Sequence, residues 1–164
     1  MAVELTVEDR IDYKKLRDVA NGGREIRVGH FDATKAEVGK KMYFGGMTNS
    51  YESKHGHGMM PGQMVPPRPY LTDGFLRDAS GVEEGAKRFF EGLFVGRGGV
   101  MAKQLADKIA TDIQSFIIED NYYADILPNA EAVIADKGSN HPLLDSGDLA
   151  KSIKGKVVKG SGDE

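Results

Sequence analysis

The chain has 164 residues and no cysteine. It therefore forms no disulfide bond, thiolate zinc site or iron–sulfur cluster, and it has no cysteine nucleophile. Also missing is any apolar run near the roughly 18 residues needed to cross a bilayer. The sequence begins MAVELTVEDR, with acids where a signal peptide requires basic residues. We therefore expect a soluble protein that carries no export signal.

A surplus of positive charge is missing as well. The chain has 22 Lys and Arg against 25 Asp and Glu, a formal net charge of -3. This balance argues against a nucleic-acid-binding or membrane-bound protein held by bulk charge. A hydrophobic fraction of 40% and a charged fraction of 29% are typical of a globular chain. We expect a single domain over residues 1–159 and a flexible tail at residues 160–164.

Glycine, by contrast, is abundant: 21 of the 164 residues are glycine, almost twice the usual share of roughly 7%. Many lie between residues 32 and 78, where hydrophobic periodicity fades and proline and methionine accumulate. We predict a long Gly/Pro/Met-rich loop there, with one short helix near residues 47–54. Its prolines predict extended geometry over residues 65–71. Its methionines indicate either a surface that packs against a partner or a local core; they are Met42, Met47, Met59, Met60 and Met64.

Regular elements are predicted on both sides of this loop. Two amphipathic helices, over residues 82–94 and 101–117, are separated by glycines at 96–99 and form the main apolar surface of the core. Ser80 and Glu83 match a capping box for the first of them. Alternation predicts a strand over residues 24–31, residues 154–158 are expected to return as a second strand, and a further helix ends near residue 20.

Candidate chemical sites are weak. His55 and His57 could share a metal, with His141, Asp145 and Glu52 as conceivable additional ligands, but a solvated loop is the better interpretation. Ser146 lacks the Gly-x-Ser-x-Gly context of a nucleophile elbow. Glycines 96–99 favour a hinge over an anion site. A solvated face is also favoured for the basic residues Arg24, Arg27, Lys35, Lys40 and Lys41. We predict no catalytic, cofactor or metal site.

Two segments resemble the signatures of one family. VPPRPYL, residues 65–71, is similar to I-P-x-R-P-F, and DKGSNHPLLDSGDLAKSI, residues 136–153, is similar to K-G-S-x-x-P-L-I-D-T-G-x-L-x-x-S-I. Both signatures belong to the small neck proteins of long-tailed bacteriophages, the tail-completion or head-to-tail joining family that includes virion morphogenesis proteins of Mu-like phages. The resemblance spans about residues 5–158. The sequence differs from the family before the proline motif. The family has a segment there that ends in E-F-G; residues 51–56 are its nearest match, and an apparent insertion follows them.

The resemblance implies an α+β protomer, an antiparallel sheet flanked by helices, that assembles into a ring, commonly a hexamer. Such a ring is a tail terminator or tail-completion protein of the virion, made in the host bacterial cytoplasm. Its partners are the tail tube, possibly the sheath, and the head connector or adaptor proteins, with DNA only as cargo through the lumen and no membrane. A head-side adaptor or stopper is the alternative. A metal-dependent hydrolase that uses His55, His57 and Asp145 is a more remote one.

The role that the resemblance implies is architectural, so no enzyme is expected. Arg68 is expected to pair with a carboxylate or with carbonyl groups, in its own protomer or a neighbour, and Tyr70 to bury its ring against the helix pair. Asp145 and Ser146 are expected to cap a short helix with apolar Leu149 and Ile153, after a tight turn at Gly147. The interface or structural residues so assigned are Pro66, Pro67, Arg68, Pro69, Tyr70, Leu143, Leu144, Asp145, Ser146, Gly147, Leu149, Ser152 and Ile153.

Overall fold

The computed structural model describes residues 24–47 and 64–159, which form a helix-rich structure with small antiparallel sheets. The elements are β1 (Arg24–His30), α2 (Ala33–Phe44), β2 (Gly46–Met47), β3 (Met64–Val65), α3 (Tyr70–Arg77), α4 (Ala79–Phe94), α5 (Gly98–Ile118), α6 (Tyr123–Ile126), α7 (Glu131–Lys137), α8 (Asp148–Lys151) and β4 (Ile153–Lys159). The predicted α+β class is confirmed. The helix predicted before residue 20 and the tail at 160–164 lie outside the described residues.

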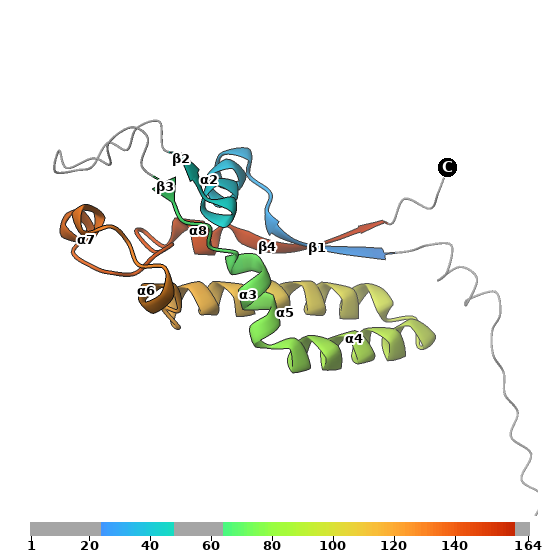
Figure 1. The fold of residues 1–164 in the computed structure, drawn as a ribbon. Coiled ribbons are helices and arrows are strands. Elements are labelled where there is room, and N and C mark those ends of the chain that lie inside the picture. The colour runs from blue at the N-terminus through green and yellow to red at the C-terminus, as the bar shows by residue number, and fades with distance from the viewer. Residues whose placement is uncertain (1–23, 48–63, 160–164) are drawn as a thin grey trace, which may run out of the picture.

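The larger sheet pairs the first described strand with the last. β1 and β4 are antiparallel, with Ile26 opposite Val157 and Val28 opposite Gly155. Ile26 and Val28 pack against the core, and Ile153 is fully buried in it. Both strands were predicted, and β4 begins one residue earlier than expected. Figure 1 shows this sheet lying along α5.

The longest helix, α5, is the centre of the core. It runs antiparallel to α4 after a break at the predicted glycines, and α3 crosses α5 before it leads into the start of α4 (Figure 1). Its apolar stripe is buried at Ile109, Ile113 and Phe116, among others. β4 approaches it closely at Gly155, where a Cβ would lie 2.2 Å from the main-chain oxygen of Ala106. The predicted helix pair is confirmed; α5 supplies the buried core residues, whereas α4 contributes the partly buried Val82, Ala86 and Phe89.

The start of α4 differs from the prediction. The helix begins at Ala79, and its N-cap is Asp78, whose Oδ1 accepts a hydrogen bond from the Gly81 amide at 3.2 Å. The Ser80–Glu83 capping box is therefore wrong. Asp78 also forms an ion pair with Lys108 of α5. The same side chain therefore caps the start of α4 and links α4 to α5.

Both ends of the predicted loop over residues 32–78 are helical. Asp32 caps α2 by accepting from the Lys35 amide at 3.0 Å, and α3 begins at Tyr70, so the extended segment ends at Pro69. The weak periodicity of α2 concealed it, because Lys and Glu dominate its surface while Met42 and Tyr43 pack against the core. Residues 48–63, including most of the short helix predicted near 47–54, lie outside the described residues.

No helix in the described parts of the chain is long and apolar enough to span a membrane.

Candidate functional site

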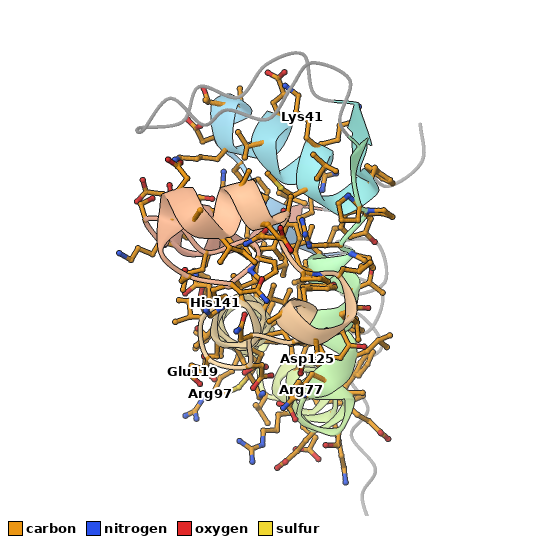
Figure 2. All side chains as sticks on the ribbon, turned by 60° about the vertical axis from the view of Figure 1, so that its left-hand side comes forward. Lys41, Arg77, Arg97, Glu119, Asp125 and His141 are labelled. Atoms are coloured by element: carbon orange, nitrogen blue, oxygen red, sulfur yellow. The ribbon has the colours of Figure 1, made fainter. Side chains whose placement is uncertain are left out.

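The two segments that carry the family resemblance line one cavity of about 630 Å³. Helices α2 and α7 and the chain between α6 and α7 complete its walls. Figure 2 views this end of the molecule, with α2 and Lys41 above α7 and with α6 and Asp125 below. The residues of the two motif segments that line the cavity are Val65, Pro66, Arg68, Lys137, Leu143, Asp145, Ser146, Gly147, Asp148 and Leu149.

Arg68 is a buried cation in this wall, 4% exposed. Its Nε and Nη2 donate to the carbonyl oxygen of Leu127 at 3.1 and 2.8 Å, and Nη2 also donates to the Pro128 carbonyl at 3.1 Å. The sequence left open whether Arg68 pairs with a carboxylate or with carbonyl groups; in the structure its partners are two carbonyl groups of the same chain. Within residues 24–47 and 64–159 no carboxylate forms an ion pair with Arg68. Burial lowers the pKa of its guanidinium.

A hydrogen-bonded chain of side chains joins the two motifs through β1. His30 Nε2 lies 2.6 Å from the Tyr70 hydroxyl, and His30 Nδ1 lies 2.7 Å from Ser152 Oγ. Ser152 donates its proton to the Leu149 carbonyl at 2.7 Å. Its Oγ therefore accepts from Nδ1–H, which leaves Nε2 to accept from Tyr70. Sequence reasoning missed His30, which no local motif marks.

This proton arrangement is structural. A serine nucleophile must donate its proton to the neighbouring histidine, whereas the nitrogen of His30 that faces Ser152 already carries a proton. Tyr70 is fully buried, as predicted, and burial raises the pKa of its hydroxyl. Its ring contacts His30 and Tyr43 edge-on, from β1 and α2.

We expect acid to weaken the fold through His30. Burial lowers the pKa of its imidazole below the ordinary value, so the unfolded chain binds the proton more readily. The stabilisation is complete above about pH 6.5 and is lost as the pH falls through the depressed pKa of the folded state. The midpoint of urea unfolding should fall between about pH 7.5 and about pH 5.5. His30→Gln should reduce this dependence; an identical pH slope in the variant would contradict the assignment.

The turn before α8 differs in part from the prediction. α8 is a single turn whose N-cap is Gly147, in the left-handed conformation with φ of 78°, so the predicted tight turn is confirmed. Ser146 Oγ accepts from the Asp148 amide at 3.3 Å. Asp145 is not the cap and instead lines the cavity. Ile153 opens β4 and does not belong to the helix, because pairing with β1 ends α8 at Lys151.

Leu143 is backbone-strained at the cavity wall. Its φ of 67° lies in a region that costs a residue with a side chain roughly 1–2 kcal/mol. The buried Pro142 precedes it. The turn thus holds the Leu143 side chain against the cavity at an energetic cost.

The candidate metal ligands are not gathered in the described structure. His55, His57 and Glu52 lie outside the described residues. His141 uses its Nε2 in a 2.7 Å hydrogen bond to the Ile117 carbonyl. No group of three metal-ligating side chains occurs within residues 24–47 and 64–159.

The predicted basic face is largely solvated, with one exception. Arg27 pairs with Glu25, and Lys41 pairs with Glu37, all at exposed positions. Lys35, however, lines the cavity, where its Nζ lies 3.7 Å from Asp148.

A second surface feature lies at the junction of α4 and α5. Phe90, Phe94, Val95 and Val100 are each between 58% and 70% exposed. The aromatic face predicted for α4 is therefore only partly core: Val82, Ala86 and Phe89 pack inward, and Phe90 and Phe94 point to solvent. These exposed apolar side chains are a candidate contact surface.

The fold and site thus define a two-stranded antiparallel sheet packed on a helical hairpin, with a cavity at one end walled by the two motif segments. Comparison with protein-family models, with curated proteins and with solved structures finds no match to this chain.

Proposed function

We propose that this protein is a structural component of the neck of a long-tailed phage virion, a tail terminator or tail-completion ring. In that role it ends the tail tube and joins the tail to the head connector, and DNA passes through its lumen as cargo. The supporting observation is that the two segments similar to neck-protein signatures, distant in sequence, line the same cavity. Because both segments form the walls of this one cavity, a function of the cavity would depend on both segments.

The internal contacts of these segments support an architectural role. Arg68 fastens the first segment to the chain between α6 and α7, and His30 links Tyr70 of the first segment to Ser152 of the second. Each of these polar side chains is engaged in holding main chain or another side chain in place. The exposed apolar group at the α4–α5 junction supplies a surface for a neighbouring copy.

Electron microscopy and mass photometry of the purified protein test this proposal. We expect a closed ring that attaches to purified tails; attachment to portal-containing heads instead would favour the head-side adaptor. The double variant Phe90→Ser/Phe94→Ser should shift the ring to smaller species, since it removes apolar area from a subunit contact.

Leu76→Ser is the matched control, because Leu76 is 59% exposed, as is Phe90, and lies on α3 away from the junction. This variant should keep the ring. A wild-type chain that stays monomeric and binds neither tails nor heads would refute the proposed function.

A further inference from the structure

The charges that line the cavity do not balance. Its walls contain three cationic side chains and two carboxylates. Lys35 lies 3.7 Å from Asp148, and the field of Asp145 raises the pKa of Lys137 against the lowering effect of burial. Each of these lysines therefore has an acidic neighbour. Arg68, the most buried cation, has none among the described residues.

The surroundings of Arg68 favour an incoming anion. Its charge and that of Lys137 repel each other, since Arg68 lowers the pKa of Lys137. Asn129 also lines the cavity, and its buried Nδ2 has no hydrogen-bond partner in the described structure. A carboxylate here would offset the repulsion and supply an acceptor for the side-chain amide of Asn129.

The remaining walls are apolar and come from several elements. Val38 and Met42 project from α2, Val133 from α7, and Leu143 and Leu149 from the turn around α8. A cavity of about 630 Å³ is in the range of sites that enclose a ligand of several hundred cubic ångströms. The matching ligand is apolar over most of its surface and carries one carboxylate.

The two ends of the described chain lie away from this cavity. Arg24 is paired with Lys159 at the end of the sheet remote from α2 and α7 (Figure 1). β1 has seven residues, so Arg24 lies about 20 Å from the end of this strand that leads into α2. Of the chain that leaves from that end, residues 160–164 are acidic but contain no large apolar side chain.

The N-terminal residues have the required chemistry. Glu4 is flanked by Val3 and Leu5 within an alternating segment, AVELTV. The 23 residues before Arg24 would span some 75 Å fully extended, and about 50 Å with the helix that is predicted to end near residue 20, which is enough to reach an adjacent subunit. A chain that leaves one end of a subunit and binds at the other end of the next subunit repeats around a closed ring.

We propose that the cavity binds the N-terminal segment of a second copy of this chain, with Glu4 paired to Arg68 and the flanking apolar side chains against the α2 and α7 walls. The inference rests on the proposed ring and names the contact that links its subunits. It makes the motif segments a receptor for the neighbouring protomer.

Photo-crosslinking within the full chain tests the proposal. Leu5→p-benzoylphenylalanine is prepared in ¹⁴N and ¹⁵N forms, which are mixed, assembled and irradiated. We expect crosslinks from position 5 to peptides of α2, α7 or residues 143–149, and we expect light–heavy pairs among them. The same photoreactive residue at Tyr13 should not reach these peptides.

Charge variants sharpen the test without removing Arg68. Glu4→Gln and Val38→Glu should each lower the light–heavy crosslink yield about tenfold, because one removes the carboxylate and the other places a competing carboxylate in the cavity. Glu8→Gln and Thr34→Glu are matched controls, in the same segment and on the same helix, and should change the yield less than about twofold.

Mass photometry of the same samples separates the two proposals. A ring whose crosslinks from position 5 reach other surfaces, form only within one isotopic chain, or are unaffected by Glu4→Gln and Val38→Glu would overturn the cavity assignment and leave the ring standing. A chain that is monomeric in every sample would overturn both.

Discussion

Arg68→Ala is expected to lower the free energy of unfolding by about 3 kcal/mol. The substitution removes the donors to the carbonyl oxygens of Leu127 and Pro128 and leaves these acceptors beside an enlarged cavity. It also detaches the proline segment from the chain that enters α7. Urea unfolding followed by circular dichroism measures the loss.

Two variants show whether the guanidinium geometry is responsible. Arg68→Lys keeps the charge but cannot reproduce the paired Nε and Nη2 bonds to one oxygen, so it should recover less than half of the loss. Arg77→Ala removes an arginine that is largely exposed and pairs with Asp120, and it should cost less than about 1 kcal/mol. Equal effects at Arg68 and Arg77 would show that the carbonyl contacts do not hold the fold.

Gly155→Ala is expected to destabilise the protein by about 3 kcal/mol, at the upper end for an added methyl group. The new Cβ would lie 2.2 Å from Ala106 O, so β4 must move away from α5. The obstacle is main chain, which no rotamer change relieves. Thermal unfolding of the purified variant measures the cost.

A second substitution shows whether the main-chain oxygen of Ala106 causes the destabilisation. Ala106→Gly removes the Cβ that would stand 2.8 Å from the added methyl group but leaves the oxygen in place. The double variant should therefore remain destabilised. Gly138→Ala is the control for conformation alone: Gly138 has a φ of 72° and open space around it, so its cost should be about 1 kcal/mol. Full recovery in the double variant would contradict the proposed contact.

The parts of the fold that the sequence predicted are those with strong local signals. The stripe of α5 repeats at helical spacing for nearly five turns, and the residues of β1 alternate, so both elements could be recognised without tertiary information. Helix α2 could not be recognised in this way, because it has few apolar residues and they do not form a clear stripe at helical spacing. Asp78 was missed as a cap since Ser80 and Glu83 fit the usual pattern better.

The candidate site was predictable as a set of residues and not as a geometry. The motifs singled out Arg68, Tyr70 and Ser152, but their partners are set by tertiary packing. The partners of Arg68 are two carbonyls, which every residue has, and His30 stands in a strand with no motif around it. The cavity itself arises only when α2 and α7 close around the two segments.

The pairing of Arg24 with Lys159 affects the order in which the chain becomes foldable. During synthesis the helical hairpin leaves the ribosome well before β4, the strand that covers α5 beside β1. A nascent or truncated chain that ends before Ile153 lacks this strand. Ser152, which forms the hydrogen bond to His30, directly precedes the strand. Release of β4 therefore completes the fold: only chains that have released this strand can pair it with β1 and cover α5.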